Sequence, residues 1–326
     1  SDYLPYLQDT DKRNITVREL LFHQSGLPST LLFYQDAIDE DSYEVHYLGT
    51  TDKLHPARIG RQTWANPNFR FRPGLTSKVR TAECTLQVCD SLWLNKSFKK
   101  EYLQKIADAP LRDKRYRYSC VGFILLQQVV EARAGMPMDE FLAQEFYTQW
   151  AEATGYLPLR FLSKEEIVPS SVDPFLRKTV LQGFVHDESA AFQGGVSGNA
   201  GLFSTAEEVA QIYQMLLNGG ELNENLFKQG DVQALYHYGC QGMPPWLGFD
   251  KPDMQNPAKS PCALSAPASV YGHTGFTGTC AWVDPDNGLV YVFLSNRIYP
   301  EVWNAKLLKS DIRERIQEAM YRAVLK

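Results

Sequence analysis

Residues 271–296, YGHTGFTGTCAWVDPDNGLVYVFLSN, carry the clearest fold signal in the chain. The runs 277–284 and 288–296 are rich in β-forming residues, and a Pro-Asp-Asn turn joins them, which predicts an antiparallel hairpin. Residues 268–273 are expected to form the neighbouring strand. Glycine weakens a strand and often marks a place where the backbone of a ligand comes close, so the three glycines around His273 indicate a binding site.

The composition limits the class of protein. With 326 residues, 44% of them hydrophobic, the chain can bury a large core in one large domain or two intimate ones. Its net charge of −5 gives no basic excess to neutralise nucleic-acid phosphates, so we expect no nucleic-acid partner. No apolar run approaches the roughly 20 residues of a transmembrane segment. The first ten residues, SDYLPYLQDT, lack the basic and apolar regions of a signal peptide.

The cysteines and histidines give no metal-binding pattern. The six cysteines form no C-x-x-C pair and are expected to be free core thiols, and the six histidines form no H-E-x-x-H motif. Residues 186–188, His-Asp-Glu, are potential ligands, but adjacent residues on most backbones do not converge on one ion. We therefore expect neither a metal nor a cofactor.

Capping residues and apolar patterns predict helices along most of the chain. The expected caps are Thr16 (with Glu19), Ser97, Ser119 and Thr205 (with Glu208). The predicted helical segments are 20–24, 98–111, 121–135, 138–150, 209–220 and 311–325. In the last of these, Ile312, Ile316 and Met320 fall four residues apart, which predicts the face that covers the sheet.

These elements predict an α/β (α+β) fold, in which helices flank an antiparallel sheet and a large, mostly helical region is inserted. We expect residues 1–28 and 245–326 to form the sheet region and residues 29–244 to form the helical region. An all-helical structure, or a parallel sheet near the C-terminus, would contradict this fold class.

Several segments together resemble the serine β-lactamase and penicillin-binding-protein superfamily. They are ITVRELLFHQSGLP (15–28), Tyr-Ser-Cys (118–120), GNAGLFSTAEEVAQIYQMLLNGG (198–220) and His-Thr-Gly (273–275). The resemblance is greatest to the class C-like branch. The run 183–208 and the segments 273–285 and 293–300 are most similar to a module often fused to glycoside hydrolase family 3 N-acetylglucosaminidases. The resemblance implies the transpeptidase-like α/β fold.

The resemblance assigns a catalytic role to Tyr118. The second motif of the superfamily is Tyr-x-Asn, and some branches have Asp in place of Asn. Tyr118 matches the tyrosine, and the resemblance implies that it acts as general base and acid near the nucleophile. The position of Tyr118 just before a helix N-terminus also favours a phenolate. Cys120 stands where the motif has Asn or Asp, and a thiol is only a weak donor and acceptor. If Tyr118 has no such role, it packs against the buried helix as an aromatic residue only.

The third motif, Lys/His-Thr-Gly, matches His273, Thr274 and Gly275. The resemblance implies a strand along the active-site groove that pairs with a peptide-like substrate, where a side chain larger than glycine would obstruct binding. His273 and Thr274 would hydrogen-bond the substrate, and a backbone N–H would contribute to an oxyanion hole. Histidine carries less positive charge than lysine at neutral pH, which weakens carboxylate binding. We expect Tyr118 and His273 to face one groove, with Cys120 beside them.

The superfamily nucleophile, a Ser-x-x-Lys ahead of the ITVRELL helix, has no counterpart in this chain. The one Ser-x-x-Lys, at Ser97–Lys100, lies after SGLP and 21 residues before Tyr118, which is the wrong order, and a helix cap explains it. The start at SDYLPYL inside a family element is interpreted as truncation at the N-terminus. We expect the chain as given to form no stable acyl-enzyme.

Two functions follow from these motifs. The first is a serine hydrolase acting through an acyl-enzyme on peptides, amides or esters, such as cell-wall peptides that contain D-amino acids. The second is a non-catalytic module that binds muropeptides for a fused N-terminal glycosidase. Either implies a small peptide-like or ester ligand and a location in the cell envelope or periplasm.

Overall fold

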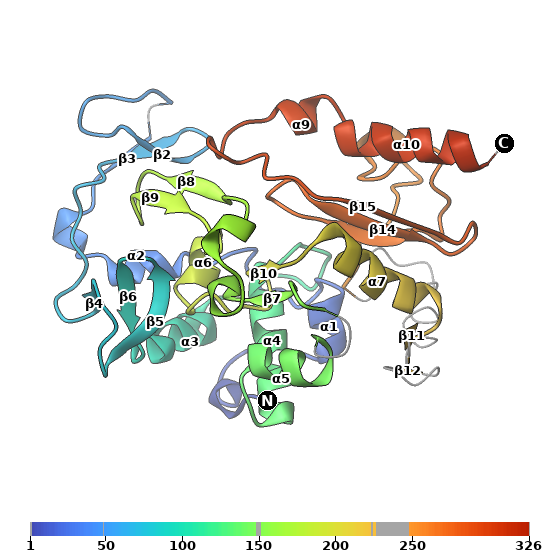
Figure 1. The fold of residues 1–326 in the computed structure, drawn as a ribbon. Coiled ribbons are helices and arrows are strands. Elements are labelled where there is room, and N and C mark those ends of the chain that lie inside the picture. The colour runs from blue at the N-terminus through green and yellow to red at the C-terminus, as the bar shows by residue number, and fades with distance from the viewer. Residues whose placement is uncertain (1, 48, 148–150, 223, 226–247, 326) are drawn as a thin grey trace. The chain divides into compact units, whose positions relative to one another are not determined.

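The chain folds into two compact units. The computed structural model describes residues 2–47, 49–147, 151–222, 224–225 and 248–325 (Figure 1). Unit 1 comprises residues 1–143, 155–203 and 299–303, and unit 2 comprises residues 144–154, 204–298 and 304–326. His237, Cys240 and the expected boundary between residues 244 and 245 lie outside the described residues.

Unit 2 is built on the sheet that the sequence predicts. Strands β13 (Tyr271–Thr274), β14 (Cys280–Asp284) and β15 (Leu289–Phe293) are consecutive antiparallel neighbours. Helix α7 (Ala206–Leu217) packs on one face, and α10 (Ile312–Val324) packs on the other (Figure 1). The predicted α+β class, with an antiparallel sheet between helices, is therefore confirmed.

The alternation along β14 explains this layering. Trp282 belongs to a cluster with Tyr291 and Tyr321 of α10, whereas Val283 belongs to a cluster with Met215 and its neighbours on α7. Successive strand residues point to opposite faces, so an all-apolar strand must be covered on both. The other described elements of unit 2 are α9 (Lys306–Lys309), β11 (Glu221–Leu222), β12 (Glu224–Asn225) and the 3₁₀ turn Pro257–Lys259.

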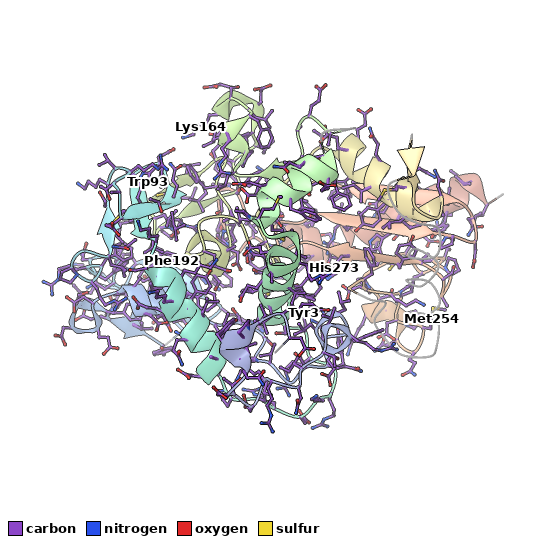
Figure 2. The ribbon with its side chains drawn as sticks, turned by 90° about the horizontal axis from the view of Figure 1, so that it is seen from below. Tyr3, Trp93, Lys164, Phe192, Met254 and His273 are labelled. Carbon is purple, nitrogen blue, oxygen red and sulfur yellow. The ribbon has the colours of Figure 1, made fainter. Side chains whose placement is uncertain are left out.

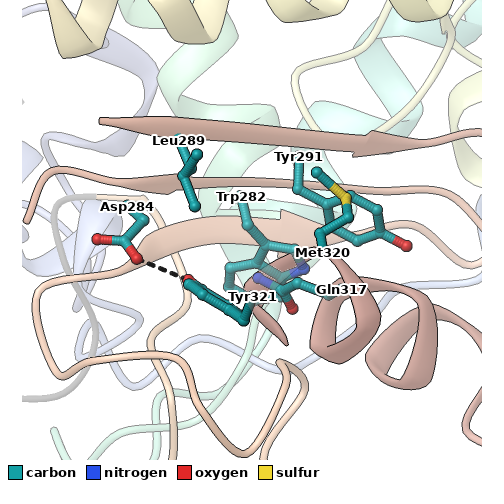
Figure 3. A pocket seen from close by; sticks show the side chains of 7 residues that line it. All are labelled: Trp282, Asp284, Leu289, Tyr291, Gln317, Met320 and Tyr321. Atoms are coloured by element: carbon teal, nitrogen blue, oxygen red, sulfur yellow. Dashed lines mark hydrogen bonds between the residues drawn. The ribbon is translucent and has the colours of Figure 1, made fainter. Parts of the chain in front are cut away.

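Helix α10 buries a different face from the predicted one. Ile316 is 40% exposed, whereas the buried residues are Arg313, Gln317 and Tyr321. Each of these polar side chains makes a hydrogen bond to the rest of unit 2: Arg313 Nη1 donates to Thr279 O, Gln317 Oε1 accepts from Ala263 N, and Tyr321 OH donates to Asp284 Oδ2. Gln317, Met320 and Tyr321 line a small pocket against the sheet (Figure 3). The apolar spacing predicted only part of this face: Met320 packs against the cluster of Trp282 and Tyr291, but Ile316 is exposed and buried polar side chains supply the rest of the attachment.

Unit 1 combines helices with small antiparallel sheets. Its helices are α1 (Val17–Leu21), α2 (Phe33–Ala37), α3 (Phe98–Asp108), α4 (Cys120–Ala134), α5 (Met138–Glu145, which runs into unit 2) and α6 (Glu188–Ala191). Short 3₁₀ turns cover Pro5–Leu7, Glu40–Ser42, Pro158–Arg160 and Lys164–Glu166. Within the described ranges, no helix combines the length and apolarity that crossing a bilayer requires.

The strands of unit 1 pair within four separate sheets. Strands β1 (Val45–His46), β3 (Thr63–Ala65) and β2 (Ala57–Gly60) form one, and β4 (Thr76–Ser77), β6 (Leu92–Asn95) and β5 (Cys84–Cys89) form another. The two-stranded sheets pair β7 (Gly155–Tyr156) with β10 (Leu202–Phe203), and β8 (Ser171–Asp173) with β9 (Thr179–Leu181).

The division of the chain thus differs from the expected one. Residues 1–28 belong to unit 1, because Leu4, Leu7 and Leu20 are buried in its core. Phe192, labelled in Figure 2, belongs to the same core. The expected helical region contains many strands, because short β-forming runs with polar turns carry too weak a period to be recognised as strands.

Candidate functional site

The SGLP turn fixes the approach to helix α4. Gly26 has φ +79°, and a Cβ there would lie 2.4 Å from Arg112 O, so glycine is required. The backbone of the turn pairs with the incoming segment, since Gly26 O accepts from Arg112 N and His23 O accepts from Arg117 N, both at 2.8 Å. The turn therefore positions the residues just before α4.

His23 and Ser119 complete this junction. The Oγ of Ser119 accepts from Gly122 N at 3.1 Å, as predicted for an N-cap, and donates to Pro28 O at 2.7 Å. The N–H of Ser119 donates to Nδ1 of His23 at 3.1 Å, and His23 is only 4% exposed. The imidazole is thus an acceptor at Nδ1 and a fixed part of the helix start.

Tyr118 lies at this junction with its ring partly in solvent. The side chain is 44% exposed, and its ring stacks at a tilt on that of His23, with 4.7 Å between centroids. The thiol of Cys120 is half-buried, and the side chains of Tyr118 and Asn199 lie near enough to influence its pKa. Unit 1 therefore brings together a phenol, a thiol and an amide at the N-terminus of a buried helix.

The Cys120 thiol is kept in its neutral form. Desolvation by burial, and then the negative charge of Asp187, raise its pKa above the ordinary cysteine value, while hydrogen bonds from Asn199 and Tyr118 act in the opposite direction. A protonated thiol is a poor nucleophile. Cys120 is therefore unsuited to replace a nucleophilic serine.

The third motif lies at the end of β13 in unit 2. His273 Nδ1 donates to Thr274 O at 2.7 Å, and its Nε2 is 3.7 Å from Asp250 Oδ2. On the edge of β13 away from β14, Asp250 pairs with Gly272 through two backbone hydrogen bonds of 2.7 and 3.1 Å. A Cβ at Gly272 would lie 2.0 Å from Ala281 O, so this glycine is required by the sheet itself.

Contacts within the chain itself favour glycine at position 275. A Cβ there would lie 2.2 Å from Thr279 Oγ1, and its N–H already donates to Thr279 O at 2.8 Å. Residues 275–279 form a tight turn in which Gly278 N donates to Gly275 O. The strand therefore ends at Thr274, and the glycine pattern partly reflects this turn.

Other sequence candidates take structural positions. Ser97 is exposed at the start of α3, but its side chain makes no capping hydrogen bond. Of residues 186–188, His186 hydrogen-bonds Ser171, Asp187 caps α6 and Glu188 is held near Arg177. These three side chains do not converge on one point.

The structure thus joins Tyr118 with Cys120, and His273 with Thr274, each pair within its own unit. That Tyr118 and His273 face one groove stays a prediction. His23 and Asn199 were missed as site residues. The HQSGLP run contained His23, and the GNAG run contained Asn199, but neither has a local signal that indicates a role beside Tyr118.

Comparison with known proteins identifies relatives. The sequence matches the β-lactamase family over residues 1–309. A Bacillus subtilis (strain 168) protein named N-acetylmuramyl-L-alanine amidase is 29% identical over 325 residues, which cover 93% of this chain and 62% of that protein. An Escherichia coli (strain K12) protein, provisionally named a D-alanyl-D-alanine carboxypeptidase, is 28% identical over 324 residues, covering 87% of this chain and 73% of that protein. The chain therefore spans less than the full length of both relatives.

Solved structures show the same fold at low sequence identity. A penicillin-binding protein from Bacillus halodurans superposes with a TM-score of 0.51 at 15% identity, covering 95% of this chain and 78% of that one. A penicillin-binding-protein homologue from Caulobacter crescentus gives 0.50 at 17% identity, covering 90% of this chain and 69% of that one. Since the family match covers nearly the whole sequence and the fold agrees, the chain belongs to the β-lactamase family.

Proposed function

We propose that the chain serves a serine hydrolase reaction that proceeds through an acyl-enzyme on peptide, amide or ester substrates. The observation that carries this is the cluster of Tyr118, Cys120 and Asn199 at the N-terminus of α4. A partly exposed phenol at a helix N-terminus is suited to transfer a proton to and from a nucleophile and a leaving group. Tyr118 would be the general base and acid of this reaction.

Asn199 compensates for the thiol in the second motif. Its amide influences the pKa of the Cys120 thiol, so an amide donor and acceptor lies near residue 120 although that residue is not Asn. The amide would bind the substrate, and Cys120 would line the site as a neutral group. His273 and Thr274 would bind the substrate carbonyl or carboxylate at the end of β13, with Gly275 turning the chain away.

The relatives suggest the substrate class. Their names refer to D-alanyl-D-alanine carboxypeptidase and N-acetylmuramyl-L-alanine amidase. We therefore propose cell-wall peptides that contain D-amino acids as substrates, and the cell envelope or periplasm as the location. Membership of the class C-like branch, and a glycosidase fused to the N-terminal side, belong to the same proposal.

Acylation tests the proposed function. The chain as given and the longest natural protein that contains it are incubated with a penicillin and with a p-nitrophenyl ester, and intact masses are measured. We expect an acyl adduct on the longer protein and none on the given chain, because no serine in it has a lysine in the family order. Tyr118→Phe should slow acylation by about 10²–10⁴-fold, and Ser97→Ala should change nothing.

An adduct on the given chain that is lost in Ser97→Ala would overturn this assignment of the nucleophile. The second candidate, a non-catalytic muropeptide-binding module, is favoured by the neutral Cys120 thiol in the second motif. It predicts that the longer protein binds a peptide ending in D-Ala-D-Ala, as measured by calorimetry, but never becomes acylated.

A further inference from the structure

A second group of reactive side chains lies in unit 1, near the sheet formed by β1, β3 and β2 (Figure 1). It consists of His46, Asp52 and His55, whose potential ligand atoms all lie within 4.8 Å of one another. In the part of the chain that the structure describes, no other group of three His, Cys, Asp or Glu side chains brings its ligand atoms this close together. We infer that these three side chains bind a divalent transition-metal ion of the Zn²⁺ type.

The distances fit one ion. His55 Nδ1 is 3.0 Å from Asp52 Oδ1, and His46 Nδ1 is 3.9 Å from Asp52 Oδ2. Nitrogen and oxygen ligands lie about 2.0–2.2 Å from Zn²⁺, so two ligands of one tetrahedral ion are roughly 3.3 Å apart. Small side-chain rotations are enough to bring these atoms onto one ion.

The two imidazoles lie close together at the proposed site. The rings of His46 and His55 are nearly parallel, with an interplanar angle of 16° and 5.2 Å between centroids. An imidazole binds a metal through the nitrogen lone pair in its own ring plane, so at least one of these two rings has to turn before both nitrogens reach one ion. Both histidines already lie beside the Asp52 carboxylate, so such a turn keeps all three side chains within reach of one ion.

The local backbone prearranges these ligands. Asp52 Oδ1 accepts from the N–H groups of Leu54 and His55, both at 2.8 Å, which fixes the direction of the carboxylate. His46 lies in β1, in register with Trp64 of β3. One ligand is therefore fixed by a turn and another by a sheet, which lowers the entropy that binding would cost.

The ligand chemistry selects the type of ion. Imidazole nitrogens suit Zn²⁺, Cu²⁺, Ni²⁺ and Fe²⁺, whereas Mg²⁺ and Ca²⁺ prefer sets of oxygen ligands. Three protein ligands leave a position for water or for a further ligand, as in open zinc sites. The His46 side chain is 19% exposed and that of His55 is 15% exposed, so an ion can enter from solvent. The expectation of no metal, drawn from the sequence, overlooked the H-x₅-D-x₂-H spacing of this group.

Calorimetric titration of the untagged, metal-free chain with Zn²⁺ tests the site. We expect one ion per chain, no response to Mg²⁺, and d–d absorption in the visible range when Co²⁺ is used. His46→Gln, His55→Gln and Asp52→Asn should each weaken Zn²⁺ binding by at least about tenfold. Asp52→Asn is especially informative, because its remaining oxygen can still accept the two backbone N–H groups of the turn.

Lys53→Ala is the matched control, since Lys53 is exposed in the same turn and offers no imidazole or carboxylate. It should bind Zn²⁺ as the unaltered chain does, and circular dichroism should show that every variant is folded. Absence of 1:1 binding, or unchanged affinity in any one of the three ligand variants, would overturn the three-ligand site.

Discussion

His23 positions the start of helix α4 through its backbone and its ring together. Its φ of +52° is in the left-handed region, which Asn and His adopt more readily than most residues. Its Nδ1 accepts the N–H of Ser119, and its ring lies against Tyr118. The position of the proposed catalytic phenol thus depends on a residue that no motif identifies.

Substitution of His23 should separate these contributions. His23→Ala places alanine at positive φ and leaves the buried Ser119 N–H without its acceptor, so we expect the free energy of unfolding to fall by roughly 2–4 kcal/mol. His23→Asn tolerates the backbone and keeps an acceptor, so it should recover at least about half of that loss. Urea denaturation measures both, and equal losses in the two variants would contradict the role of the acceptor.

At the scale of helices and strands, a capping residue is predicted correctly where its hydrogen-bond partner is close in sequence. Thr16 and Glu19 form the predicted reciprocal capping box. Thr205 caps α7, but Glu208 instead accepts from the N–H groups of Glu152 and Ala153 and from Thr154, all distant in sequence. A cap is predictable from four residues, whereas competition from donors distant in sequence is not.

Asp284 connects the predicted hairpin to α10. Its Oδ1 accepts from the N–H groups of Asp286 and Asn287, and its Oδ2 accepts from Asn287 Nδ2 and the buried hydroxyl of Tyr321 (Figure 3). The sequence predicts the turn, but nothing local indicates that the same carboxylate binds Tyr321 of α10, 37 residues later.

Asp284→Ala should lower the free energy of unfolding by about 2–4 kcal/mol, because Tyr321 OH and the turn lose their acceptor in a buried place. Asp286→Ala, in the same turn but exposed, should stay within about 0.5 kcal/mol of the unaltered chain. Thermal and urea unfolding of the two variants provide the comparison. A similar effect in both would mean that the turn, and not the link to α10, sets the stability.

At the scale of the whole molecule, the sequence predicted the sheet and its helices but not the division of the chain. The hairpin around 284–288 is local, so its register follows from the turn. Unit 1, by contrast, takes residues 299–303 from a stretch whose flanks belong to unit 2. The placement of residues 299–303 in unit 1 depends on packing between segments distant in sequence, and neither an apolar period nor a capping residue predicts it.

The stability of unit 1 should depend on pH through a buried ion pair. Asp173 and Arg177 are 8% and 0% exposed at their side chains, and Arg177 Nε donates to Asp173 Oδ2 at 2.6 Å. Desolvation opposes the charge on Asp173, but the charge of Arg177 and the hydrogen bonds from Arg177, Phe175 and Leu176 outweigh it and lower its pKa. Nearby Glu188 is shifted the other way, because burial raises its pKa.

A carboxyl group with a lowered folded-state pKa stabilises the fold above its unfolded pKa, which is about 4, and loses this effect as pH falls through the folded value. Asp173→Asn removes the charged partner that is hydrogen-bonded to the buried Arg177, so at pH 7 it should reduce the free energy of unfolding by about 3–5 kcal/mol. The difference between Asp173→Asn and the unaltered chain should be constant from pH 7 to about 5 and shrink below about pH 4. Glu188 is present in both proteins, so the subtraction reduces its contribution. Urea unfolding at several pH values measures this difference, and a gap that grows on acidification would show that Asp173 is protonated in the folded chain.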